Sequence, residues 1–340
     1  MMRIMKRTRK NLSDSKGRIA KKLRISVTDR CNFTCLFCMP KKVQANWIPK
    51  DEILSFEEII RVTKILVSLG IDKVRITGGE PLQRNGIEDL VTRIRSLKGV
   101  KTVDMTTNGW YLAEKSKDLS AAGLGGITIS LHSLRPDRFK DITGLNALPK
   151  VLEGIDSAFN AGLKPIKINS VAIRGYNDDE IIDLVNFARE RNATIKFIEF
   201  MPLDGLGIWS PDKMISGKEV LSIVSEYLTI IPNGREPGST TTTWSFEDGR
   251  GSLGVITPMT QPFCDDCDRI RLNADGKLLT CLFDINYYDV RSLIRNPDTK
   301  DEDLAEYISE CVMKKPAGVE YMPFVKEFWK KPRAMHAIGG

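Results

Sequence analysis

Apolar and polar residues alternate in short runs along the first two thirds of the chain, a pattern typical of β-strands. Longer segments between these runs carry apolar residues at the three- and four-residue spacing of amphipathic helices. The predicted strands are 23–27, 73–77, 102–106, 126–130, 166–171 and 194–200. The predicted helices are 55–69, 87–96, 112–122, 148–161 and 178–191. Successive β/α units of this kind predict an α/β fold with a parallel sheet or partial barrel.

One face of five of these strands is polar. In the second strand, for example, Arg75 stands between Val74 and Ile76. Parallel strands covered on both faces are almost continuously apolar, and a filled barrel has branched apolar residues inside. We therefore predict a barrel whose interior holds a polar ligand; an open sheet with one wet face is the less common alternative. The sixth strand, around Lys196, does not follow the pattern cleanly.

The regular alternation of predicted strands and helices ends at about residue 230. Two predicted hairpins follow, 241–246 with 253–256 and 269–272 with 277–281, and short helices come after them. We interpret this region as a small antiparallel extension of the barrel. The predicted organisation is thus a basic flexible arm over 1–20, a barrel over 21–230 and a C-terminal extension over 231–340.

Composition narrows the class of protein. The chain has 340 residues, of which 41% are hydrophobic and 28% charged, so it can bury a sizeable core. Its formal charge of +7 suits a small anionic substrate at least as well as nucleic acid. No apolar run approaches the length of a membrane span, and the basic N-terminus lacks the apolar stretch of a secretory signal. We expect a cytoplasmic protein; a mitochondrial transit peptide is a weaker interpretation of the basic arm.

Three cysteines follow the first predicted strand directly in a CxxxCxxC pattern: Cys31, Cys35 and Cys38, the first cysteine group. The carboxyl ends of parallel strands are where α/β proteins place their chemistry. Three thiolates are one short of the four that close a structural iron–sulfur or zinc site, so a metal bound here keeps an open position. A zinc knuckle would need a fourth ligand, and no histidine lies nearby in the sequence.

Gly78, Gly79, Glu80 and Pro81 follow the second predicted strand. Glycine lacks Cβ and lets a ligand approach the backbone, while a carboxylate beside it can receive an ammonium group. One β/α unit after CxxxCxxC, this motif resembles the radical S-adenosylmethionine (SAM) superfamily. The resemblance implies a [4Fe-4S] cluster whose open iron is chelated by the amino and carboxylate groups of SAM.

Cys264, Cys267 and Cys281 form a second cysteine group around the second predicted hairpin. A zinc ribbon would have a second CxxC pair, whereas here a single cysteine follows the first pair. We leave Cys311 as a buried free thiol, since isolated cysteines are usually core residues. A second cluster with one open iron would bind substrate rather than SAM. Arg269 and Arg271, two residues apart on a strand, point the same way and suit a phosphate.

These segments and the terminal Gly-Gly together resemble the GTP 3′,8-cyclases of molybdenum-cofactor biosynthesis, over nearly the whole chain after about residue 15. The resemblance implies a partial (β/α)6 barrel of the radical SAM type, with an antiparallel extension that carries the second of two [4Fe-4S] clusters. It places Phe37, Gly78, Gly79, Glu80, Ser130 and Met201 at SAM. It places Arg24, Arg75, Thr106, Lys167, Arg269 and Arg271 at GTP. It makes Arg269, Arg271, Gly339 and Gly340 the catalytic set.

The implied reaction converts GTP to (8S)-3′,8-cyclo-7,8-dihydroguanosine 5′-triphosphate, the first step toward molybdopterin. The implied partners are GTP, SAM, an electron donor of the flavodoxin or ferredoxin type and a downstream cyclic pyranopterin monophosphate synthase. A homodimer is possible, and neither nucleic acid nor a membrane is expected. This chain departs from the usual Ser-Leu-Asp at Ser130-Leu131-His132.

Two other interpretations share some of these features. A radical SAM peptide-maturing enzyme with an auxiliary cluster has the same arrangement of cysteines, but the basic residues of the barrel interior favour a triphosphate. A zinc-binding, nucleic-acid-binding protein would use CxxC and the basic arm. Iron and sulfide in the purified protein would exclude the latter, whereas zinc in a colourless protein would support it.

Overall fold

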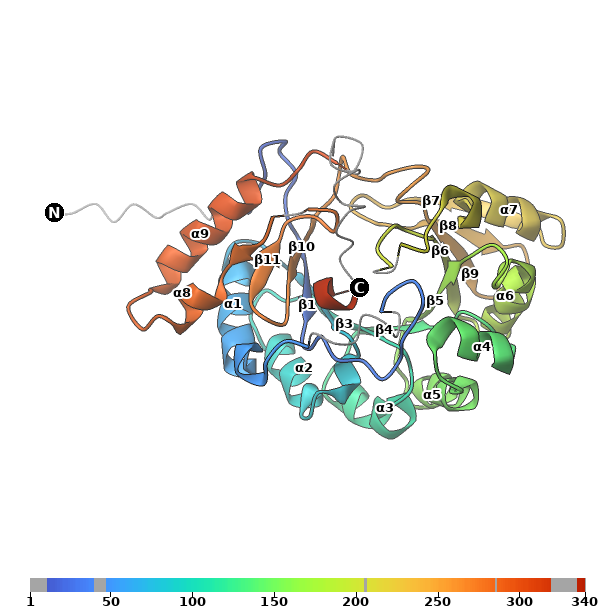
Figure 1. Ribbon diagram of the computed structural model, residues 1–340, viewed down its shortest axis with the longest axis horizontal. Helices are drawn as coiled ribbons and strands as arrows, with labels where there is room; N and C mark the ends of the chain where they lie inside the picture. The colour runs from blue at the N-terminus through green and yellow to red at the C-terminus, as the bar shows by residue number, and fades with distance from the viewer. Residues whose placement is uncertain (1–10, 40–46, 205–206, 285, 319–334, 340) are drawn as a thin grey trace.

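The computed structural model describes residues 11–39, 47–204, 207–284, 286–318 and 335–339. Six parallel strands form its centre and lie side by side in chain order, curving into an open ring (Figure 1). They are β1 (Lys22–Ser26), β2 (Lys73–Thr77), β3 (Thr102–Thr107), β4 (Gly126–Ser130), β5 (Ile166–Ala172) and β6 (Thr194–Glu199). The predicted partial barrel and its six strands are confirmed, with bounds shifted by one residue at most.

Helices cover the outside of the ring (Figure 1). They are α1 (Phe56–Ser68), α2 (Ile87–Arg95), α3 (Leu112–Ala121), α4 (Pro136–Thr143), α5 (Leu148–Asn160), α6 (Ile181–Glu190) and α7 (Gly217–Ser225). Strand residues that point outward, such as Leu23, Ile25 and Ile76, are fully buried against them. The strand alternation therefore separates a dry outer face from a polar inner face. Neither α4 nor α7 was predicted, because α4 is short and rich in charged residues and α7 lies beyond the regular β/α repeats.

The extension joins both edges of the barrel. It contains β7 (Ile230–Gly234), β8 (Thr242–Phe246), β9 (Ser252–Ile256), β10 (Arg269–Leu272), β11 (Lys277–Leu279), β12 (Tyr288–Asp289), α8 (Arg291–Arg295) and α9 (Asp301–Met313). The predicted hairpins are present as β8–β9 and β10–β11, both antiparallel. The extension is nevertheless not a separate antiparallel unit, because β9 pairs in parallel with β6 and β10 in parallel with β1. One twelve-stranded sheet results within the described residues.

Residues 11–20 differ from the flexible arm that the charge pattern predicts. Leu12 and Ala20 are each 1% exposed, and the backbone N–H of Leu12 donates to the carbonyl of Leu69 (3.1 Å). Arg18 is buried in an ion pair with Asp14 (2.5 Å). The two apolar side chains fill the core beside α1, and this burial outweighs the preference of the basic residues for water. Residues 1–10 of the predicted arm lie outside the described residues.

The last described segment is a short 3-10 turn, η7 (Met335–Ile338). It lies in the middle of the ring of strands (Figure 1). Ile338 is fully buried there against Leu203, Leu279 and Phe283. The C-terminal end of the chain therefore closes part of the barrel interior. None of the helices in the described ranges has the length and apolar character that a bilayer crossing needs.

Replacement of Leu12 by Ala tests whether residues 11–20 belong to the fold. Because Leu12 is fully buried, we expect Leu12→Ala to lower the free energy of unfolding by about 2–5 kcal/mol in urea denaturation followed by circular dichroism. Ile19→Ala is the matched control, since Ile19 is 38% exposed and its loss should cost about 0.5 kcal/mol or less. Equal, negligible effects of both substitutions would show that this segment is a flexible arm.

Candidate functional site

The polar faces of the barrel strands line a cavity of about 810 Å³, which we call the chamber. Both cysteine groups line it: Cys31, Cys35 and Cys38 from the loop after β1, and Cys264, Cys267 and Cys281 from the extension. The pairing of β10 with β1 brings residues some 230 positions apart in sequence to one space. The predicted polar interior is thus a feature of this fold, and both cysteine groups line it.

The loop of the first cysteine group is held by the end of α4. The backbone N–H groups of Thr34 and Leu36 donate to the carbonyls of Thr143 (2.9 Å) and Ile142 (3.0 Å). Phe33, 3% exposed, packs edge-on against Trp110 and Phe139 with ring centroids 6.2 and 6.0 Å away. Phe33, the middle one of the three residues between Cys31 and Cys35, is therefore buried in the core and fixes the position of the cysteine loop.

Gly78 and Gly79 allow two loops to pack together as well as lining the chamber. The N–H of Gly79 donates to the carbonyl of Thr28 (2.7 Å), and a Cβ added to Gly79 would lie 2.1 Å from the carbonyl oxygen of Arg30. Any side chain at residue 79 would push away the backbone that leads into Cys31. The glycines are needed for this contact, whereas the sequence argument considered only the approach of a ligand.

Glu80 lies behind the loop and, unlike Gly78 and Gly79, is not among the described residues that line the chamber. Its carboxylate is fully buried and accepts from the backbone N–H groups of Leu82 (3.0 Å) and Asn108 (2.7 Å) and from the Thr107 hydroxyl (2.7 Å). Burial raises the pKa of Glu80 to about 7 in spite of these donors. Asn108 in turn donates its amide N–H to Cys31 Sγ (3.7 Å). Glu80 thereby fixes the loop that contacts a cysteine of the first group.

Cationic side chains line the chamber across successive strands. Strand register places Arg24 directly between Arg75 and Arg271. The Arg75 guanidinium donates to Asp104 (2.9 Å), Thr128 (2.9 Å) and Thr106 (3.3 Å). Like charges at adjacent register positions repel one another, so this arrangement favours an anionic occupant. Arg24, Arg75, Thr106 and Lys167, all predicted from the polar strand faces or the family resemblance, do line the chamber together.

The electrostatics of the chamber confirm that its cations are crowded. Burial, followed by the charges of Arg271, Arg75 and Arg269, lowers the pKa of Arg24 well below its usual value. Burial and Arg269 lower the pKa of Arg271 to about 10. Burial is the larger cause and the neighbouring guanidinium charges add to it, so an anion bound there would raise these pKa values again.

Lys196 is a chamber residue that the sequence argument did not assign. It lies opposite Asn169 in the β5–β6 ladder, lines the chamber and donates to the Thr241 hydroxyl (3.1 Å). Burial and the nearby charges of Lys167 and Arg75 lower its pKa to about 7. The sixth strand therefore adds one cation to the polar interior, next to the apolar Ile198 that also lines the chamber, and the signal was the lysine between Ile195 and Phe197.

The second cysteine group is bordered by the two predicted arginines. Arg269 donates to Cys267 Sγ (3.3 Å) and to the carbonyl of Gly238 (3.0 Å). Arg271 donates to the carbonyl of Gly339 (2.5 Å), so the C-terminal tail does reach the chamber wall. A Cβ on Gly339, whose φ is +72°, would lie 2.9 Å from Thr77 Oγ1. Gly340 lies outside the described residues.

Phe37, Ser130 and Met201 also line the chamber. The Phe37 ring lies edge-on to His132, with centroids 4.7 Å apart. His132 Nδ1 accepts from the backbone N–H of Val171 (3.1 Å), and burial lowers the pKa of His132 to about 3. The imidazole is therefore neutral, with its remaining proton on Nε2.

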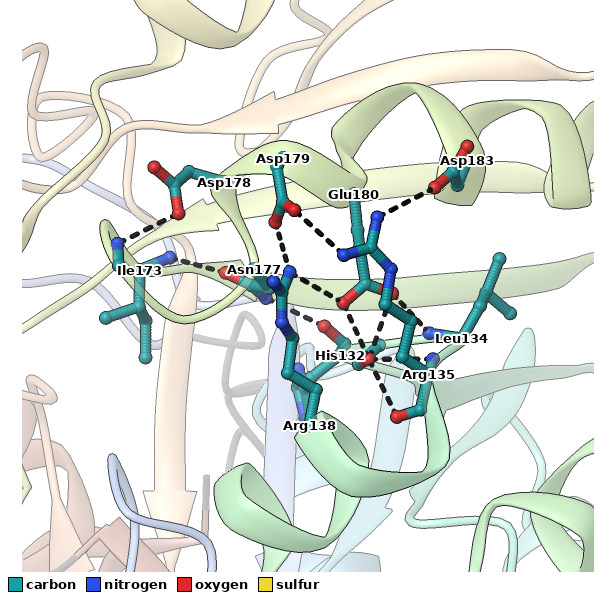
Figure 2. A network of polar contacts seen from close by, with 12 residues as sticks. His132, Leu134, Arg135, Arg138, Ile173, Asn177, Asp178, Asp179, Glu180 and Asp183 are labelled. Atoms are coloured by element: carbon teal, nitrogen blue, oxygen red, sulfur yellow. Dashed lines mark hydrogen bonds and ion pairs between the residues drawn. The ribbon is translucent and has the colours of Figure 1, made fainter.

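A buried polar network fixes the loop that carries His132 (Figure 2). The Asn177 amide donates to the carbonyls of His132 (2.8 Å) and Val171 (2.9 Å), which joins the ends of β4 and β5. Glu180, fully buried, accepts from the Ser133 hydroxyl (2.8 Å) and the N–H of Leu134 (2.7 Å). These contacts make the loop after Ser130 a rigid part of the chamber wall.

The cysteines differ in their electrostatic surroundings. Burial and Glu80 raise the pKa of Cys31 to about 12, and burial raises that of Cys281 to about 11. Burial also pushes the pKa of Cys267 upward, but Arg269 and Lys315 bring it below the usual value. Within the described ranges, no three His, Cys, Asp or Glu side chains are arranged to hold a single metal ion. Thiols grouped in threes on one wall suit a multinuclear cluster, whose irons space its ligands more widely than one ion does.

Two family models match the chain. Residues 25–188 match the radical SAM superfamily, and residues 193–321 match Molybdenum Cofactor Synthesis C. Between them, these matches include every cysteine of both groups.

Curated relatives match over most of the chain. A GTP 3′,8-cyclase of Aquifex aeolicus is 43% identical over 284 residues, 83% of this chain and 88% of that protein. A GTP 3′,8-cyclase of Rhodopirellula baltica is 41% identical over 336 residues, 97% of this chain and 92% of that protein. A third, from Thermodesulfovibrio yellowstonii, is 39% identical over 97% of this chain and the whole of that protein.

Solved structures resemble the chain in fold. Streptococcus suis SuiB bound to S-adenosylmethionine superposes with a TM-score of 0.60 at 17% identity, over 79% of this chain and 63% of SuiB, a little under two thirds of its length. SuiB bound to the precursor peptide SuiA gives a TM-score of 0.62 at 16% identity, over 89% of this chain and 67% of SuiB. At such identities the similarity concerns the radical SAM architecture alone.

Substitution of Glu80 tests its role in fixing the loop. Glu80→Gln keeps the size of the side chain but turns an NH2 group toward a backbone N–H or the Thr107 hydroxyl, so we expect a loss of about 1–3 kcal/mol in the free energy of unfolding. Glu153→Gln, on the exposed face of α5, should change it by less than about 0.5 kcal/mol. If the two variants unfold at the same urea concentration, Glu80 does not organise the loop.

Proposed function

The chain belongs to the GTP 3′,8-cyclase family of radical SAM enzymes, and on that basis we propose that it cyclises GTP to (8S)-3′,8-cyclo-7,8-dihydroguanosine 5′-triphosphate, the first step of molybdopterin synthesis. One observation supports this most strongly: both cysteine groups and a row of half-buried cations line the same chamber. A radical source and a triphosphate site in one chamber are what the reaction needs, because the ribose 3′ C–H bond is not acidic enough for a side-chain base to break.

We propose that Cys31, Cys35 and Cys38 hold a [4Fe-4S] cluster that binds SAM, and that Cys264, Cys267 and Cys281 hold a second [4Fe-4S] cluster. The residues fit these groups: each set offers three thiols on the chamber wall, one short of a closed site. When bound, the reduced first cluster and SAM supply a carbon-centred radical that removes a hydrogen atom from an unactivated C–H bond. The protein's own part is to position both ligands and exclude water.

SAM is assigned to the part of the chamber beside the first cysteine group. Phe37, Gly78, Gly79, Ser130 and Met201 line the chamber and are proposed to contact it. Glu80 contributes indirectly, because its buried carboxylate fixes the loop that carries the two glycines.

GTP is assigned to the cationic wall. Arg24, Arg75, Thr106, Lys167, Arg269 and Arg271 are the proposed contacts, and we add Lys196. Asp104 and Thr128 hold the Arg75 guanidinium in place before substrate binds, so little of its freedom remains to be lost. A triphosphate compensates the mutual repulsion of these groups far better than a neutral ligand could.

The tail is proposed to complete the catalytic set. Arg269, Arg271, Gly339 and Gly340 form this set, and the contact of Arg271 with the Gly339 carbonyl supports a tail that sits at the reacting nucleotide. The close approach of Gly339 to Thr77 explains why a glycine is needed in this position.

We further propose a cytoplasmic enzyme that receives electrons from a flavodoxin or ferredoxin type of donor. A cyclic pyranopterin monophosphate synthase would consume its product, and a homodimer is a possible assembly. The barrel is proposed to span residues 21–230 and the extension 231–340, with the boundary after the first residue of β7.

An anaerobic assay tests the proposed function. The iron–sulfur-reconstituted protein is mixed with reductant, SAM and GTP, and the products are identified by mass spectrometry. We expect 5′-deoxyadenosine together with a cyclised isomer of GTP. If 5′-deoxyadenosine forms while GTP is unchanged, the substrate is wrong, as for a peptide-maturing enzyme. A colourless protein that contains zinc and yields neither product would favour the zinc-binding alternative.

Replacement of Arg271 tests whether GTP and SAM bind at different parts of the chamber. Because Arg271 lies in register with Arg24 and away from the first cysteine group, Arg271→Ala should weaken GTP binding by about 10–100-fold, measured by anaerobic calorimetry, while SAM binding is retained. Arg93→Ala, on the outer surface of α2, removes the same charge far from the chamber and should change neither affinity. Unchanged GTP affinity in Arg271→Ala would refute the phosphate role.

Lys196 should make GTP affinity depend on pH. With its pKa lowered to about 7, the free ammonium is charged below pH 7 and neutral above it. Anion binding must then recover a proton, so affinity should fall by about tenfold between pH 6 and pH 8. Lys196→Arg stays charged throughout and serves as the reference for the titration of GTP itself. Parallel pH profiles for the two proteins would show that Lys196 does not face the phosphates.

A further inference from the structure

Lys315 is a buried cation that the proposed reaction does not use. It follows α9 directly and is 5% exposed. Its ammonium donates to the carbonyl of Cys267 (2.8 Å), to Cys267 Sγ (3.4 Å) and to the carbonyl of Arg269 (2.9 Å). All three donors of the ammonium group are therefore directed to one turn of the second cysteine group.

The partners of Lys315 lack a carboxylate. In the part of the chain that the structure describes, its ammonium forms no ion pair with Asp or Glu, and its contacts are two carbonyls and one sulfur. A buried charge is costly unless an opposite charge compensates it. The sulfur of Cys267 is the contact that can carry negative charge. Arg269 directs a second cationic N–H to the same sulfur (3.3 Å).

The backbone that carries Lys315 is fixed from its other side by Arg18. The Arg18 guanidinium donates to the carbonyls of Pro316 (2.6 Å) and Ala317 (2.7 Å) and also to the carbonyl of Cys264 (2.8 Å). Asp14 holds this guanidinium in place. The segment after α9 is thus fixed against the CxxC turn, which places the ammonium of Lys315 at Cys267.

We propose that Lys315 is a positioning residue that sets the reduction potential of the second cluster through its contact with Cys267. The inference rests on the proposed function, since it requires Cys264, Cys267 and Cys281 to hold that cluster. N–H donors directed at a cluster sulfur raise its reduction potential, because reduction adds negative charge that a nearby cation stabilises. Cys267 thus accepts from two cationic donors, Lys315 and Arg269. Of these, Arg269 is also a proposed GTP contact, whereas Lys315 is not.

The experiment measures the potential of the second cluster alone. In the full chain, Cys31, Cys35 and Cys38 are replaced by Ala so that one cluster remains, and Lys315→Met is added to this background. In EPR-monitored redox titrations, the ratio of reduced to oxidised second cluster at a fixed potential should be about tenfold or more lower with Lys315→Met than without it. This corresponds to a negative shift of about 59 mV in the reduction potential of the cluster. Iron and sulfide content and the thermal unfolding midpoint are recorded for each protein.

Lys314→Met is the matched control. It removes the same charge one residue away, from an exposed side chain whose ammonium lies 5.9 Å from the Tyr288 ring and is not among the contacts of Cys267. We expect little shift in this variant. Equal shifts in Lys314→Met and Lys315→Met, or no shift in either, would overturn the proposal, because the direct contact with Cys267 would then have no specific effect.

Two further outcomes keep the inference testable. If Lys315→Met does not retain a cluster, the same titration is carried out on Lys315→Gln. The Gln amide keeps N–H donors but lacks the charge, so this variant should give a smaller negative shift of the reduction potential. An unchanged potential in Lys315→Gln would refute the proposal. If the protein with Lys315 intact binds no iron once Cys31, Cys35 and Cys38 are replaced, the assignment of the second cysteine group itself is wrong, and the inference falls with it.

Discussion

The concentration of positive charge inside the barrel is the constraint on which the other features of the site depend. Arg24 lies in register between Arg75 and Arg271, and Lys167 and Lys196 line the same chamber. Asp104 pairs with Arg75 (2.9 Å), but the described residues that line the chamber include eight Lys or Arg and only three carboxylates. Folding of the barrel therefore brings together charges that repel one another, and the proposed triphosphate compensates them. The cations that the barrel strands bring together are thus the same groups that are proposed to bind the triphosphate.

Segments from near both ends of the chain contact residues that line the chamber. Both cysteine groups line the chamber, at opposite ends of β1: Cys31 follows the carboxyl end of β1, whereas Cys267 precedes β10, which pairs in parallel with β1. Residues 11–20 and the segment after α9 meet at Arg18, which contacts the carbonyls of Cys264 and Pro316. The tail then enters the ring of strands, where Gly339 contacts Arg271 (Figure 1). The extension is thus continuous with the barrel sheet, and both termini stabilise the same side of the site.

Local patterns predicted the parts of this structure that depend on local spacing. Strand alternation identified the polar interior, and cysteine spacing identified both groups, because period and spacing survive folding unchanged. Contacts between segments that are far apart in the sequence could not be predicted from local patterns. Leu12 looked like part of a charged arm, Glu80 looked like a ligand group, and Lys315 carried no signal, since each acquires its role from residues far away in the sequence. The edge pairings β10–β1 and β9–β6 were missed for the same reason.

Recognition of phosphate by the half-buried cations of the chamber is the central property of the proposed site. Its sharpest test is a series of equilibrium binding measurements on the reconstituted full chain with GTP, GDP, GMP and guanosine at one ionic strength. If the cationic wall holds the triphosphate, affinity should fall by about tenfold or more with the loss of each charged group and be lowest for guanosine. Guanosine that binds as tightly as GTP would contradict the account, because the chamber would then recognise the base and leave its cations uncompensated.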